Sequence, residues 1–295
     1  MRILVPTDGS EYSEAAAKFL LRLNLSSHDE ISILHVISED PFQDSDDYYV
    51  KRVREVKNAI APTIIDNLAN ILREVPARID KVVTTGCPDT CIVEASIRQN
   101  SDLIVMGPKR VKGIRSHIVG SITKSVSINS PKPILVIKPP RDGMPKGMKI
   151  LFSTDGSAYA MKAGELLMSM PLHDDTEITV LRVITPAFYD IPEQFMVTVD
   201  TRMKEDLKNL MDRESAAIDD SVAKATNYLR SRFSRVHSLT KTGEPTDEIL
   251  QTAYDLQSDI IVLGSKGMGG LRGVIDSISR YILSVADCSV LIGKT

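Results

Sequence analysis

The chain begins with a stretch that returns about half a chain later. Residues 1–21, MRILVPTDGSEYSEAAAKFLL, are matched by residues 150–168, ILFSTDGSAYAMKAGELLM. The shared residues run through an expected strand, turn and helix, so one strand-turn-helix unit occurs twice. This period is far longer than the roughly 20 to 50 residues of solenoid repeats. The two halves are therefore expected to be two copies of one fold.

Further repeats show that the duplication runs from end to end. SDLIVMG at Ser101 matches SDIIVLG at Ser258, and GCP at Gly86 matches GEP at Gly243. In each half, short apolar runs alternate with amphipathic helical stretches, a pattern that indicates parallel, doubly wound sheets with right-handed crossovers.

The resulting expectation is an α/β chain of two tandem, five-stranded, Rossmann-like domains, residues 1–140 and 147–295, joined by a Pro- and Gly-rich linker at 139–147. The expected strands are 3–6, 31–37, 81–85, 101–106 and 133–137, then 149–153, 177–184, 236–241, 259–263 and 289–292. A long helix follows the second strand of each half. In the first half its inward stripe is expected to be Val53, Val56, Ile60, Ile64, Leu68, Ile71 and Val75.

Composition excludes several function classes. A net charge of −3 gives no broad basic surface for nucleic acid or for an anionic membrane. No apolar run approaches the ~20 residues of a membrane span, and the first apolar run starts too early for a signal peptide. We therefore expect a cytoplasmic protein that binds neither nucleic acid nor membrane.

Three cysteines show no disulfide spacing, which fits a reducing compartment. Cys87 and Cys91 would lie one turn apart near a helix start. They could act as redox thiols, but the simpler interpretation, two partly buried small residues, is favoured.

The candidate site lies where ligands collect in such sheets, in the crevice beyond the carboxyl ends of the strands. Asp8 ends the first strand, and Gly107 ends the fourth and opens a loop to a helix that begins near Gly120 and Ser121. Free N–H groups at a helix start favour phosphate. The corresponding residues of the second half are Asp155 and the loop GSKGMGG, residues 264–270, in which Lys266 could add a positive charge.

A purely structural interpretation is also open. Gly107 and Gly264 could simply turn the chain, and Asp8 and Asp155 could cap the first helices. For the aspartates we favour ligand contact, because the Gly-Ser that follows each one already supplies a turn and a cap.

Each half resembles a universal stress protein domain, and the whole chain resembles a tandem universal stress protein over nearly its full length. The residues that carry the resemblance are ILVPTDGS and ILFSTDGS, then LHVI and LRVI, and a glycine pattern after the fourth strand: Gly, two residues, Gly, nine residues, Gly-Ser/Thr. The resemblance implies a fold of the adenine nucleotide alpha hydrolase-like type.

It also implies that members with the full glycine pattern bind ATP or AMP, with Mg²⁺ able to accompany ATP. The aspartate of the first strand and the valine of the second would hold adenine and ribose, and the glycine loop and Gly-Ser would hold the phosphates. The implied residues are Asp8, Val36, Gly107, Gly120 and Ser121 in the first half, and Asp155, Val183, Gly264 and Gly267 in the second.

Both halves depart from the pattern. The first has Arg110 at the second glycine, where its side chain could grip a phosphate or fill the space. The second has Ser277 and Ile278 in place of Gly-Ser, so Ser277 or Ser279 would have to supply the hydroxyl. The second half, with the more glycine-rich loop, is the better candidate for phosphate binding by sequence.

Three functions remain open. The first is a nucleotide-responsive stress or signalling protein without strong catalysis, with slow ATP hydrolysis as a variant. The second is a nucleotidyl transferase or ATP pyrophosphatase of a related fold, disfavoured because neither HIGH nor SGGxDS occurs in the sequence. The third is a scaffold with degenerate sites.

The resemblance further implies that single-domain relatives dimerise through the fifth strand. The two halves are therefore expected to form a pseudo-dimer through 133–137 and 289–292, and a homodimer of whole chains is also open.

Overall fold

The computed structural model describes residues 1–39, 48–108, 119–138, 147–185, 200–266 and 275–294. Two of the expected site residues, Arg110 and Gly267, lie outside these ranges, as does most of the expected linker. In the described ranges, no helix is long and apolar enough to cross a membrane.

The two halves contain the same elements in the same order. The first half consists of β1 Arg2–Thr7, α1 Glu11–Leu20, β2 Glu30–Ser38, α2 Tyr48–Ile71, β3 Arg78–Gly86, α3 Pro88–Arg98, β4 Leu103–Met106, α4 Ser121–Asn129 and β5 Ile134–Val136. The second half consists of β6 Lys149–Ser153, α5 Ala158–Ser169, β7 Glu177–Ile184, α7 Thr201–Arg230, β8 Arg235–Thr242, α8 Pro245–Asp255, β9 Ile260–Gly264, α9 Ser277–Val285 and β10 Ser289–Gly293. Every expected strand is present, with ends that differ from the expected ones by at most three residues.

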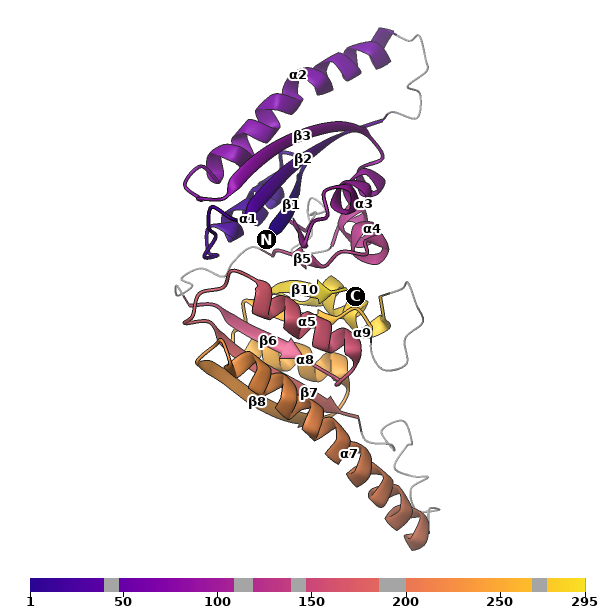
Figure 1. The fold of residues 1–295 in the computed structure, drawn as a ribbon. Coiled ribbons are helices and arrows are strands. Elements are labelled where there is room, and N and C mark those ends of the chain that lie inside the picture. The colour runs from indigo at the N-terminus through magenta and orange to yellow at the C-terminus, as the bar shows by residue number, and fades with distance from the viewer. Residues whose placement is uncertain (40–47, 109–118, 139–146, 186–199, 267–274, 295) are drawn as a thin grey trace.

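All these strands form one ten-stranded sheet in the order β3-β2-β1-β4-β5-β10-β9-β6-β7-β8. Within each half the paired strands are parallel, whereas β5 and β10 pair antiparallel. The expected pair of five-stranded parallel sheets is therefore joined edge to edge. In Figure 1, β5 and β10 lie between the halves, and the long helices α2 and α7 lie at the two far ends.

Helices cover both faces of the sheet, as the doubly wound pattern predicts. On one face α1, α2, α5 and α7 pack into a single apolar core, and on the other α3, α4, α8 and α9 form a second one. Strands covered on both sides read as continuous apolar runs, which explains sequences such as LIVM in β4, where every residue is buried. Both cores continue across the join between the halves.

The inward stripe expected for α2 is wrong over its first half. Val53, Val56 and Ile60 are 47%, 56% and 47% exposed, and the buried residues are Ala61, Ile65 and Leu68. The first turns of α2 extend past the edge of the sheet (Figure 1), so their apolar face does not meet the core. Periodicity locates an apolar face, but it does not tell how much of that face a sheet covers.

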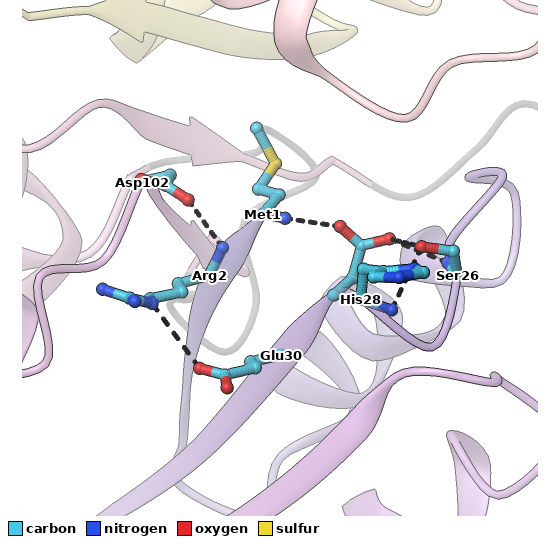
Figure 2. A network of polar contacts seen from close by, with 7 residues as sticks. Met1, Arg2, Ser26, His28, Glu30 and Asp102 are labelled. Carbon is cyan, nitrogen blue, oxygen red and sulfur yellow. Dashed lines mark hydrogen bonds and ion pairs between the residues drawn. The ribbon is translucent and has the colours of Figure 1, made fainter.

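A polar network fixes the start of β1 to its two neighbouring strands (Figure 2). The Met1 amine contacts Asp29 Oδ1 at 2.5 Å, and the backbone N–H of Arg2 donates to Asp102 Oδ2 at 2.7 Å. Burial alone would raise the pKa of Asp29, but hydrogen bonds from the Met1 amine and from Ser26 outweigh it and lower the pKa. Asp259 repeats the role of Asp102 in the second half, where its Oδ2 accepts from the Lys149 N–H at 2.7 Å.

The join between the halves is an antiparallel ladder in which Val136 pairs with Val290 and Ile134 with Ile292, and all four side chains are fully buried. Further contacts cross the join beside it. The Asn24 N–H donates to the Pro171 carbonyl oxygen at 2.7 Å, and the Arg22 guanidinium lies 3.4 Å from Asp259 Oδ1.

Two lysines reach across the join in opposite directions. Lys294, which follows β10, donates to the carbonyl oxygen of Ser127 in the last turn of α4 at 2.8 Å. Lys138, which follows β5, donates to the carbonyl oxygen of Ala286, the C-cap residue of α9. Carbonyls at a helix end lack partners within the helix, and a cation there also interacts favourably with the helix dipole. Each half therefore caps a helix of the other.

Burial makes these lysines sensitive to pH. Desolvation lowers the pKa of Lys138 and of Lys294 to about 8 each, below the ordinary value of 10.5. Between these values the unfolded chain holds more protons than the folded one, so the free energy of unfolding should rise as the pH rises from about 8 to 10.5, by up to about 3 kcal/mol per lysine.

Urea unfolding of the wild type and of Lys138→Met at several pH values tests this. The stability of the wild type relative to Lys138→Met should increase with pH across that window, whereas Lys18→Met, which removes a lysine that is 61% exposed, should leave the pH dependence unchanged. If the free energies of unfolding of the wild type and Lys138→Met changed with pH in parallel, the lowered pKa of Lys138 would be contradicted.

Candidate functional site

The turn after β1 is held by its own side chains. Asp8 Oδ1 accepts hydrogen bonds from the Ser10 N–H at 3.1 Å and the Ser10 hydroxyl at 2.5 Å, and Ser10 is the N-cap of α1. Asp8 is therefore not the helix cap. Its second oxygen, Oδ2, accepts no hydrogen bond from the described residues, and the side chain is exposed. One carboxylate oxygen holds the turn, and the other is available to a ligand.

The second half repeats this turn. Asp155 Oδ1 accepts from the Ser157 N–H at 3.0 Å, and Ser157 is the N-cap of α5. Gly9 and Gly156, the third residues of the two TDG turns, have the same positive φ of 78°, a conformation that glycine adopts without steric cost. The two turns are thus alike in sequence and in backbone conformation.

Gly107 and Gly264 end β4 and β9 in close contact with the first helix of their half. A Cβ on Gly107 would lie 2.2 Å from the Tyr12 carbonyl oxygen, and one on Gly264 would lie 2.8 Å from the Ala160 nitrogen. Neither has a positive φ. These glycines are required by close backbone packing, which neither of the sequence-based alternatives, a turn or a phosphate contact, had foreseen.

The helix that follows the glycine loop starts differently in the two halves. The N-cap of α4 is Gly120, which supplies no side-chain cap, and the described residues offer no acceptor to the N–H groups of Ser121, Ile122 and Thr123. The N-cap of α9 is Asp276, whose carboxylate accepts from the Ser279 N–H at 2.7 Å. The N–H groups at the start of α4 are therefore open to an anion, whereas the start of α9 already binds the carboxylate of Asp276.

This geometry corrects the sequence alignment of the two loops by one residue. The Thr123 hydroxyl donates to the Gly107 carbonyl at 3.2 Å, and the Ser279 hydroxyl donates to the Gly264 carbonyl at 2.8 Å, so these residues are equivalent. Ser277 therefore corresponds to Ser121, and Ile278 corresponds to Ile122 rather than replacing a serine. The second half keeps the hydroxyl, and Asp276 is what stands in place of Gly120.

Each half has a cavity beside these residues, of about 180 Å³ in the first and about 110 Å³ in the second. Of the expected site residues, Asp8, Val36 and Gly107 line the first cavity, and Asp155, Val183, Gly264, Lys266 and Ser279 line the second. Gly120, Ser121 and Ser277 are not among the lining residues of these two cavities; they lie at the helix starts just before the lining residues Ile122, Thr123 and Ile278.

Several lining residues were not expected from the sequence. Among them are residues from the start of the helix after β3 or β8: Pro88 and Ile92 in the first half, Pro245 and Ile249 in the second. The repeated Gly-x-Pro was visible in the sequence, but nothing in it indicated that this helix forms a wall of the cavity.

Comparison with known proteins shows the family. The model of the universal stress protein family matches residues 1–138 and again 148–294. The chain belongs to the universal stress protein family. Universal stress protein MJ0577 of Methanocaldococcus jannaschii is 28% identical over 152 residues, which cover 46% of this chain and 94% of that protein. Universal stress protein YxiE of Bacillus subtilis is 28% identical over 156 residues, 49% of this chain and 97% of that protein.

A solved structure supports the fold over the whole length. A universal stress protein from Archaeoglobus fulgidus DSM 4304 covers 99% of this chain and 98% of its own, with a TM-score of 0.64 and 21% identity. The chain is thus a tandem universal stress protein with a Rossmann-like α/β fold in each half.

The cysteines of this universal stress protein favour the structural interpretation. Cys87 is the N-cap of α3, and a hydrogen bond to Asp89 raises the pKa of its thiol. Burial raises the pKa of Cys91. A raised pKa reduces the thiolate fraction that redox chemistry needs. Among the described residues, no three His, Cys, Asp or Glu side chains gather into a set that could hold a metal ion.

The packing of Gly107 predicts the effect of adding one methyl group. Gly107→Ala should lower the free energy of unfolding by roughly 2 kcal/mol or more, because the new Cβ would overlap the Tyr12 backbone. The matched control is Gly164→Ala, within α5, where the new Cβ would meet only Phe152 at 3.5 Å and should raise stability by about 0.5 to 1 kcal/mol. Equal effects in urea unfolding would contradict this account.

Proposed function

We propose that this universal stress protein binds one adenine nucleotide, ATP or AMP, in the cavity of its first half, and acts in a stress response or in signalling without strong catalysis. The observation that carries the proposal is the uncapped start of α4 at Gly120, next to a cavity lined by Asp8 and Val36. It reverses the sequence-based preference for the second half.

The cavity offers what a nucleotide needs. Val36, Ile92 and Met106 supply apolar walls that suit a base, and the open Oδ2 of Asp8 can accept a hydrogen bond from ribose or base. The N–H groups at the start of α4 can donate hydrogen bonds to a phosphate, and the positive end of the helix dipole favours the negative charge of that phosphate. Mg²⁺ would enter with ATP, bound to its phosphates.

Asp8 provides the test. Asp8→Asn keeps an oxygen that can hold the turn through Ser10, but it replaces the other acceptor with a donor. It should weaken binding of AMP by about 1 to 3 kcal/mol, as should Asp8→Ala. Asp155→Ala, the matched change in the second half, should leave AMP affinity unchanged. Calorimetry on the three variants measures these effects.

The opposite pattern, loss of affinity with Asp155→Ala alone, would move the site to the second half. If AMP, ADP and ATP all failed to bind and to raise the melting temperature of the wild type, the chain would be a scaffold with degenerate sites.

We also propose that residues 1–140 and 147–295 are two domains that associate as a pseudo-dimer. The support is the antiparallel β5–β10 ladder, whose apolar strand would be a bare edge in a separated half. Each half expressed alone should therefore self-associate at tens of micromolar, as measured by sedimentation. Clean monomers at that concentration would contradict the proposal.

A further inference from the structure

The two cavities share most of their apolar and hydroxyl-bearing lining positions. Thr7 and Asp8 correspond to Thr154 and Asp155, Val36 to Val183, Pro88 and Ile92 to Pro245 and Ile249, Met106 and Gly107 to Leu263 and Gly264, and Ile122 and Thr123 to Ile278 and Ser279. The part suited to a base and a ribose is therefore present in both halves. One clear difference lies at the helix start, where Gly120 of the first half corresponds to Asp276 of the second.

Asp276 is held firmly in this position. Its backbone N–H donates to the Ser265 carbonyl at 3.0 Å, and its side chain accepts from the Ser279 N–H at 2.7 Å. The side chain is half-buried and lines the cavity. The carboxylate thus occupies the place in which an incoming phosphate would meet the N–H groups of α9.

Lys266 lines the same cavity as Asp276. Its ammonium lies over the Tyr159 ring, 5.3 Å from the centroid, and forms no ion pair with Asp276 in the described part of the chain. An incoming phosphate at the start of α9 would therefore lie beside the Asp276 carboxylate, and like charges at short range are strongly unfavourable.

We infer that Asp276 bars phosphate from the second cavity, which instead takes an unphosphorylated nucleoside. The inference rests on the proposed function for the choice of adenine as base. The chain then has one nucleotide site and one nucleoside site, and Asp276 at the start of α9 excludes phosphate from the second.

Calorimetric titration of the full chain with AMP and with adenosine tests this. The wild type should bind one AMP and two adenosine molecules per chain. Asp276→Gly, which recreates Gly120 in the second half, should bind two AMP. Gly120→Asp should weaken AMP binding at least 100-fold while adenosine still binds at both cavities. Both substitutions are compatible with the backbone, because Gly120 and Asp276 have nearly the same φ and ψ, −65° and 160° against −64° and 168°.

The control is Asp200→Gly. Asp200 is the N-cap of α7 and accepts from the Met203 N–H at 2.7 Å, so this change removes the same kind of cap at a residue that lines neither cavity. It should leave the AMP stoichiometry at one.

The outcomes separate the inference from the proposed function. Two AMP on the wild type, no added AMP on Asp276→Gly, or one adenosine per chain would overturn the inference. If the wild type bound no AMP, the proposed first-half site would fail, and a gain of one AMP on Asp276→Gly would still support the role of Asp276.

Discussion

The antiparallel pairing of β5 with β10 is the contact on which the rest of the structure depends. The ladder is short, Ile134–Val136 against Ile292–Val290, but it turns two sheets with bare apolar edges into one continuous sheet. Lys138 and Lys294 reinforce it by capping α9 and α4 from the opposite half. Their pKa values are lowered because burial removes each ammonium from water, which costs free energy. The hydrogen bonds that the ammonium groups donate to helix-end carbonyls, which lack partners within the helix, offset this desolvation.

The same contact ties the two cavities to the join. The helices α4 and α9 begin beside a cavity and end at the join, so the residue that faces a ligand and the carbonyl that meets a lysine lie on one short rigid element. Since β5 and β10 run in opposite directions, the carboxyl ends of their parallel neighbours β4 and β9 also point in opposite directions, and the cavities share no lining residue. Each half therefore forms its own site, while the other half supports the helix that shapes it.

Sequence reasoning predicted the features that repeat a local pattern. All the strands, the doubly wound order and the turns at Asp8 and Asp155 followed from periodicity and from the duplication, whereas Val36 and Val183 were implied by the family resemblance. It failed where an outcome depends on a neighbour distant in sequence. The exposed face of α2 depends on where the sheet ends, and the need for Gly107 depends on the Tyr12 backbone. The loop alignment failed because counting residues from Gly264 places Ser277 at the glycine position, whereas the hydrogen bond from Ser279 to Gly264 shows that the second loop is one residue shorter.

The two halves differ at the N-cap of the helix after the glycine loop, a position that the fold leaves free to vary. Val36, Ile92, Val183 and Ile249 face their cavities but also pack in the apolar core, so exchanging them for polar residues would weaken folding whatever the ligand. The N-cap is different. Glycine and aspartate are both accepted there, and here they share one backbone conformation, so the rest of the helix need not move when one replaces the other. An aspartate even stabilises the helix by capping it. In a duplicated domain, an aspartate at this one residue can thus lower the affinity for phosphate and raise the stability of the helix, while the apolar core and the β5–β10 pairing stay unchanged.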